Sequence, residues 1–182
     1  MPRIKPITGK ADVPAHGHHV VEAVEKTFGG VRGPFSILLH SPTLAERLLP
    51  LVHFFRDESV VDAKLRSVAI LAAVREREAA YVWAAQVAAA RRNGLGDDVI
   101  DLLRAKGDAG KLGDDEREIV AYVRQLMRTN KVDQKMFDAL KSRHNEQWMV
   151  EMTAAANYFA FLSGVVNAFE VAAPPDGDKL PA

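Results

Sequence analysis

The chain of 182 residues contains no cysteine. Without a thiol it cannot form a disulfide, a thiolate nucleophile, an iron–sulfur ligand set or a cysteine-type zinc site. Aromatic residues make up only 7% of the chain, and the 24 Lys and Arg residues balance 24 Asp and Glu residues. A chain with no net charge, and with no basic run interleaved with aromatic residues, has little to attract nucleic acid. We therefore expect no nucleic-acid partner.

The chain also lacks an uninterrupted apolar segment of membrane-spanning length. Its longest apolar-rich run, residues 147–171, is interrupted by several polar residues: Glu151, Asn157, Ser163, Asn167 and Glu170. So many polar groups are poorly tolerated in hydrocarbon. Residues 1–17 lack the apolar core of a signal peptide. We expect no membrane partner and a cytoplasmic location.

What the chain does have is enough apolar sequence, 48% of its residues, for one real core. Apolar residues recur at helical spacing, and no segment alternates convincingly as a strand would. This pattern predicts an all-α multi-helix bundle. The predicted helices are 14–28, one that begins at Pro42 behind a Ser41 cap, 60–76, 77–93, 97–105, 114–128, one capped by Asp133, and 146–171.

The pattern divides the chain into one domain and two end segments. Breakers such as Pro2, Pro6 and Gly9 predict an extended arm over residues 1–13, and residues 14–171 form a single helical domain. The polar, Pro-rich residues 172–182 predict a disordered tail. The last helix is apolar on nearly every side, so it is either central to the core or shared with another subunit. We expect a homo-oligomer; a buried helix in a monomer is the alternative.

Four short segments share their order and spacing with a known family. They are 39–42 (LHSP), 64–71 (KLRSVAIL), 81–86 (YVWAAQ) with 93–95 (NGL), and 112–117 (LGDDER). Together they resemble the carboxymuconolactone decarboxylase family, which includes the alkylhydroperoxidase-D-like proteins. The resemblance covers roughly residues 33–171 and implies that family's helical bundle for the domain.

The resemblance also implies catalytic positions, and this chain fills them differently. In the peroxidase branch one helix carries Cys-x-x-Cys-x-x-x-His and the preceding helix carries a glutamate. The matching residues here are Ala79, Val82 and Gln86, with Ser67 on the preceding helix. With no thiolate, a thiol peroxidase mechanism is excluded. In the decarboxylase branch the Glu and His of a YEWxxH motif transfer protons, and here they are Val82 and Gln86, neither of which titrates near neutral pH.

Only the aromatic residues of that motif remain, so Tyr81 and Trp83 are candidate walls of a substrate pocket. Gln86 could orient a ligand carbonyl or carboxylate, or it could form a hydrogen bond between helices. If the chain is catalytic, the proton must come from His40 or Glu78. The alternatives are a histidine packed at a helix junction for His40 and a solvated turn for Glu78.

One histidine cluster is compatible with a metal site, because His16 and His19 would share a helical face. Only Asp12 and Glu22 supply acidic neighbours, so exposed histidines, including His18, are the better interpretation. We expect no bound metal and no cofactor.

The favoured function is therefore a carboxymuconolactone decarboxylase-like protein that acts on, or binds, a small carboxylated lactone or a related intermediate of aromatic catabolism. If active, it would be a carboxy-lyase. The alternative is a non-catalytic ligand-binding or assembly protein on the same scaffold, for which peroxidase is a family-level label only.

Overall fold

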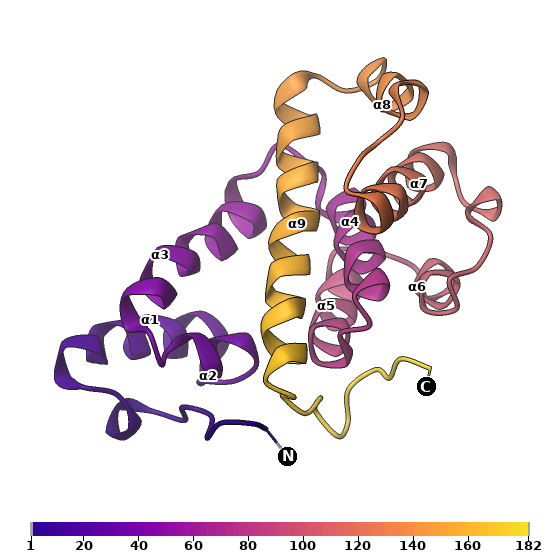
Figure 1. Cartoon of the computed structure of the whole chain (residues 1–182). Coiled ribbons are helices and arrows are strands. Elements are labelled where there is room, and N and C mark those ends of the chain that lie inside the picture. Colours follow the sequence, from indigo (N-terminus) through magenta and orange to yellow (C-terminus); the bar gives the residue numbers. More distant parts are fainter. Residues whose placement is uncertain (1, 182) are drawn as a thin grey trace.

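The computed structural model describes residues 2–181 and folds them into nine α-helices, with no strand in that range (Figure 1). The predicted all-α class is confirmed. The helices are α1 (His18–Phe28), α2 (Pro34–Leu38), α3 (Pro42–His53), α4 (Ala63–Glu76), α5 (Ala80–Arg92), α6 (Asp97–Arg104), α7 (Asp114–Thr129), α8 (Gln134–Lys141) and α9 (Glu146–Ala168). A π-helical turn, Phe54–Glu58, follows α3 directly.

Helix α4 is the centre of the bundle. It packs against α9, α7 and α5, and every residue from Arg66 to Arg75 is buried. Its first turn is capped by the carboxylate of Asp62, which accepts from the amides of Lys64 and Leu65 at 2.9 and 3.1 Å. This cap places the start of α4 at Ala63, so the predicted start at Val60 was three residues early.

The two predicted helices of the signature region do not abut. Helix α4 ends at Glu76, and α5 begins only at Ala80. Between them Glu78 has a φ of 51°, a left-handed conformation that turns the chain. Helix α1 is likewise shorter than predicted. It begins at His18, after a 3-10 turn over Ala15–Gly17, instead of at Pro14.

Helix α9 runs the length of the molecule beside α4 (Figure 1). Its start is as predicted, since the side chain of Asn145 accepts from the amide of Trp148 at 2.9 Å. It ends at Ala168, before the predicted Val171. Length and composition alone would let it cross a membrane, but 61% of its apolar window is buried inside the protein. Such burial is typical of a core helix.

Both end segments lie against the bundle. In the predicted arm, Ile7 and Val13 are buried, and the Ile7 amide donates to the Ser36 carbonyl at 2.8 Å. After α9 the chain has no regular secondary structure. We predicted disorder for residues 172–182, whereas the structure gives the part up to 181 defined contacts, through Asp178 in particular.

Candidate functional site

The α4–α5 hairpin carries the positions that the family resemblance marks as catalytic. Ala79, directly before α5, and Val82 on α5 are 0% and 3% exposed, and Gln86 is half-buried on the same side of the helix. On α4, Ser67 is buried. Its hydroxyl donates to the Ala63 carbonyl at 2.8 Å and accepts from Asn93 at 3.0 Å. None of these four side chains titrates near neutral pH, so the hairpin has no proton carrier at the positions that the resemblance marks as catalytic.

Tyr81 and Trp83 do not share an environment. Two residues apart on α5, they point about 200° apart around the helix axis. Tyr81 lies against Gly33 in the loop before α2, and burial raises the pKa of its phenol. Trp83 is fully buried on the other side, with the guanidinium carbon of Arg104 6.0 Å from its ring centroid. The expectation that Tyr81, Trp83 and Gln86 line a single cleft is therefore wrong for the two aromatic residues.

The two candidate proton carriers are exposed and held elsewhere. The ring Nε2 of His40 hydrogen-bonds the Lys5 carbonyl at 2.9 Å, in the N-terminal segment. The carboxylate of Glu78 pairs with Lys106 at 2.5 Å and with Arg75. The hydrogen bond from Lys106, together with the charge of Arg75, lowers the pKa of Glu78, so this group is an anion at neutral pH and not a proton donor.

Three charged residues that the sequence did not single out meet on the surface of α5 and α6. Arg91 on α5 and Arg104 at the end of α6 both bind the carboxylate of Asp178. Asp178 lies 87 residues after Arg91 in the chain. No spacing rule links positions so far apart, so sequence patterns could not have found this cluster.

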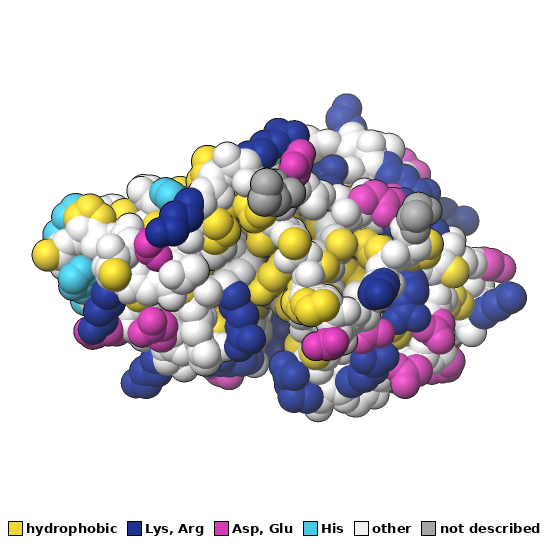
Figure 2. Space-filling model, turned by 90° about the horizontal axis from the view of Figure 1, so that it is seen from below, with side chains coloured by type: hydrophobic (Ala, Val, Ile, Leu, Met, Phe, Trp, Pro, Cys, Tyr) yellow, Lys and Arg dark blue, Asp and Glu magenta, His cyan; other side chains and the backbone are white. Residues whose placement is uncertain are grey.

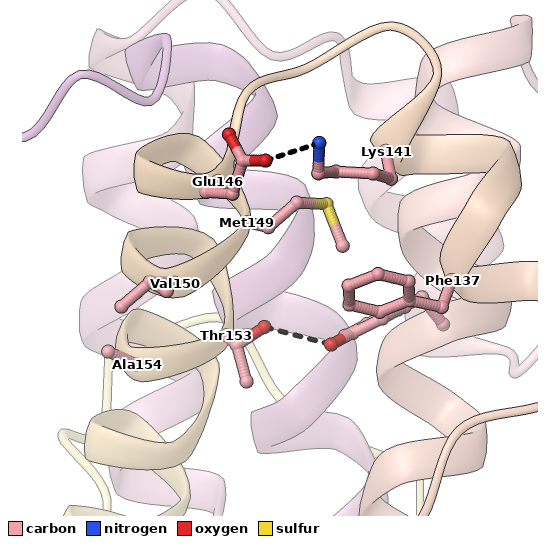
Figure 3. Close-up of a pocket in the computed structure, with 8 residues that line it drawn as sticks. Phe137, Lys141, Glu146, Met149, Val150, Thr153 and Ala154 are labelled. Atoms are coloured by element: carbon pink, nitrogen blue, oxygen red, sulfur yellow. Dashed lines mark hydrogen bonds and ion pairs between the residues drawn. The ribbon is translucent and has the colours of Figure 1, made fainter. Parts of the chain in front are cut away.

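A groove lies between α9 and the pair α7 and α8, with a volume of about 370 Å³. Figure 3 shows Met149 and Phe137 directed into it from opposite sides. At one end Lys141 pairs with Glu146 at 2.7 Å, and along the wall the hydroxyls of Tyr122 and Thr153 lie 3.0 Å apart. The remaining lining residues are Val150 and Ala154. It is an open apolar groove with polar groups along its edge.

A second groove, of about 330 Å³, lies between α1 and α3. His19 and His53 both line it, and His19 pairs with Glu46 at 3.2 Å. Of the predicted histidine cluster, His18 instead bonds the Val13 carbonyl at 3.1 Å. Within residues 2–181 no three His, Asp or Glu side chains are grouped to hold a metal ion. Neither groove is lined by Tyr81, Trp83 or Gln86.

Solved structures match this arrangement of helices. An alkylhydroperoxidase AhpD core, an uncharacterized peroxidase-related protein from Ralstonia eutropha JMP134, superposes with a TM-score of 0.73 over 95% of both chains at 16% identity. The fold is that of the AhpD-like proteins. The debrominase Bmp8, as a Cys-to-Ala variant in complex with 2,3,4-tribromopyrrole, matches with a TM-score of 0.73 over 96% of this chain and 95% of its own at 17% identity.

A further AhpD-like match is a peroxidase-related protein from Silicibacter sp. TM1040, with a TM-score of 0.74 over 96% of this chain and 90% of its own at 13% identity. No protein-family model and no curated protein sequence matches the chain. The family resemblance drawn from the sequence is thus confirmed for the fold. Within this AhpD-like fold the chain has no cysteine anywhere, and its α4–α5 hairpin holds Ser67, Ala79, Val82 and Gln86 where the resemblance implies catalytic groups.

Proposed function

We propose that this chain is a binding protein for a small carboxylated aromatic or lactone-type molecule, built on the AhpD-like scaffold and without thiol chemistry. The observation that carries the proposal is the α4–α5 hairpin itself. The positions that the resemblance marks as catalytic hold no thiol and no side chain that titrates near neutral pH, and two of them, Ala79 and Val82, are buried and apolar.

The ligand class is supported from two sides. The sequence resembles a decarboxylase family whose substrates are carboxylated lactones. A protein of the same fold, Bmp8, was crystallised with 2,3,4-tribromopyrrole, which is a small aromatic molecule. A molecule of this size and character is therefore compatible with the scaffold.

A carboxy-lyase activity on a carboxylated lactone is the other function that the resemblance implies. It needs a group that gives a proton to the product carbon. Glu78 is ion-paired and anionic, and His40 is engaged with the Lys5 carbonyl on the surface. These contacts favour binding over turnover.

Two assays on the purified chain test the proposal. With hydroperoxide and dithiol donors we expect no rate above the protein-free background. With a set of aromatic and lactone carboxylates, each matched to its uncharged amide, we expect the carboxylates alone to raise the melting temperature and no substrate to lose CO2. Peroxide turnover would refute the argument from the missing thiol.

Carbon dioxide release would instead favour the enzyme. In that case the double variant His40→Ala, Glu78→Gln tests whether these residues donate the proton. A loss of turnover would identify one of them as the proton donor. Unchanged turnover would remove both from the mechanism.

A further inference from the structure

The segment after α9 folds back over α5 and α6. A turn closed by the Gly177 amide, which donates to the Pro174 carbonyl at 3.1 Å, brings the backbone onto α5. The approach is close, since a β-carbon on Gly177 would lie 2.7 Å from that of Ala84. Leu180 then packs against the core. Residues 174–180, here called the tail segment, therefore cover part of the surface that α5 and α6 would otherwise expose.

Asp178 is the point at which the tail segment is held. Its Oδ2 accepts from Nη1 of Arg91 at 2.6 Å, and its Oδ1 accepts from Nη2 of Arg91 at 3.2 Å and from Nη2 of Arg104 at 2.8 Å. One carboxylate thus receives three N–H groups from two guanidinium groups on different helices. Forked, charge-assisted contacts of this kind are how proteins recognise carboxylates.

Both arginines are oriented independently of the tail segment. Arg91 donates through Nε to Asp97 at 2.8 Å, and Arg104 donates through Nη1 to Asp101. The terminal nitrogen atoms that remain, both Nη of Arg91 and Nη2 of Arg104, face Asp178. Because the anchoring aspartates belong to α6, contacts that do not involve Asp178 hold the two guanidinium groups in place.

Buried donors without a partner lie beside this pair. The indole Nε1 of Trp83 and the Nε of Arg104 are both shielded from solvent, and no residue between 2 and 181 accepts from either. The Trp83 ring is itself completely buried, next to Arg104. Unpaired buried donors are uncommon in folded proteins, and a ligand oxygen would supply the acceptor that these two lack.

The tail segment is held weakly by comparison with the helices. It has no regular secondary structure, and its ion pairs are partly exposed, with 44% of the Arg91 side chain accessible. Ion pairs at such sites contribute on the order of 0–1 kcal/mol each. Figure 2 views the end of the bundle at which both termini lie, and hydrophobic side chains gather at its centre with charged ones around them.

We propose that Arg91 and Arg104 form a binding site for the carboxylate of a small aromatic acid, and that Asp178 occupies this site in the ligand-free chain as an internal competitor. The ligand class rests on the proposed function, whereas the location rests on the contacts of Asp178. The other explanation is that Asp178 only fastens the chain end.

Benzoate is the probe, and benzamide is its uncharged control. The full-length chain is compared as wild type, Asp178→Asn and the matched control Asp176→Asn, since Asp176 is an exposed carboxylate two residues earlier. The chain has two tryptophans, so a Trp148→Phe background leaves Trp83 as the only indole fluorophore. Benzoate binding is followed by this fluorescence and by calorimetry.

We expect benzoate to bind Asp178→Asn at least about tenfold more tightly than the wild type, because a tethered carboxylate acts at an effective concentration in the millimolar range. Asp176→Asn should bind benzoate with the affinity of the wild type, and benzamide should bind to none of the three proteins. Adding Arg104→Gln to Asp178→Asn should abolish binding. Asp178→Ala serves as a second variant, and circular dichroism verifies the fold of each.

Equal affinities for the wild type and Asp178→Asn, or no saturable binding by Asp178→Asn, would overturn the proposal. Benzoate binding that survives Arg104→Gln would leave the proposed function standing and refute this site. Conversely, peroxide turnover together with Asp178-dependent benzoate binding would refute the proposed function and leave the site.

Discussion

The ring of Tyr81 occupies the space that a side chain on Gly33 would need. A β-carbon at Gly33 would lie 2.2 Å from Cε1 of Tyr81, and Gly33 has a φ of 59°. Clash and conformation both oppose substitution, so Gly33→Ala should lower the free energy of unfolding by about 2–4 kcal/mol. Urea denaturation measures this change.

Gly94→Ala is the matched control for that variant. Gly94 has a φ of 81° and nothing within 4 Å of its virtual β-carbon, so only the backbone term of about 1 kcal/mol applies. Equal losses of unfolding free energy in Gly33→Ala and Gly94→Ala would show that the Tyr81 ring does not contact Gly33 this closely in solution.

Glu76 is a nearly buried carboxylate whose loss leaves arginines without a counter-ion. Its side chain is 8% exposed and accepts from Nε and Nη2 of Arg128 at 2.8 and 2.7 Å, with Arg124 at 3.8 Å. Burial works against ionisation, yet the hydrogen bond from Arg128 leaves the pKa of Glu76 below its ordinary value. Glu76→Gln should destabilise the chain by about 2 kcal/mol, since it leaves the largely buried guanidinium of Arg124 without its counter-ion, whereas Arg128 is 55% exposed and stays solvated.

The comparison for Glu76 is Glu170→Gln. Glu170 likewise accepts hydrogen bonds from Nε and Nη2 of an arginine, here Arg3, but both side chains are more than half exposed. This change should lower stability by about 1 kcal/mol or less. Similar losses at both sites, measured by chemical denaturation, would mean that burial of Glu76 contributes nothing.

His144 makes stability depend on pH near neutrality. Its ring stacks on Trp148 with centroids 3.7 Å apart and planes 8° apart, and burial lowers its pKa from the ordinary 6.5. Below pH 6.5 the unfolded chain takes up a proton at His144 that the folded chain resists, so the free energy of unfolding falls as the pH falls through this window.

His144→Phe keeps an aromatic ring against Trp148 but cannot titrate. We expect its stability to fall less than that of the wild type between pH 7 and pH 5.5, as measured by thermal unfolding at several pH values. An identical slope in both proteins would remove His144 as the cause.

The prediction of a homo-oligomer was drawn from the apolar character of the last helix, and exposed apolar side chains on α3 and α9 are the places to test it. Leu44 and Leu51 on α3 are 45% and 39% exposed, and Phe161 on α9 is 43% exposed. Association would bury this surface. Phe161→Lys should lower the mass measured by light scattering after gel filtration, whereas Val60→Lys, at a similarly exposed site outside both helices, should not. A wild type that elutes as a monomer at every concentration would contradict the prediction.

Local patterns in the sequence were sufficient for the helices and for the family of fold. The apolar period placed most helices to within a few residues, and Gly29 ends α1 in the left-handed conformation expected of a C-terminal cap. Two of the boundaries that were wrong, at Val60 and Arg77, lie where a side-chain cap and a left-handed residue interrupt the pattern. The period alone could also have separated Tyr81 from Trp83, because residues two apart lie on opposite sides of a helix.

The sequence by itself determined that the chain is helical and that thiol chemistry is impossible, because periodicity and residue identity are local properties. Tertiary structure alone decided which charges distant in the sequence meet. Arg91, Arg104 and Asp178 converge only because α5, α6 and the returning chain end are packed together. The pairing of groups distant in sequence depends on the path of the whole backbone, which no short pattern encodes.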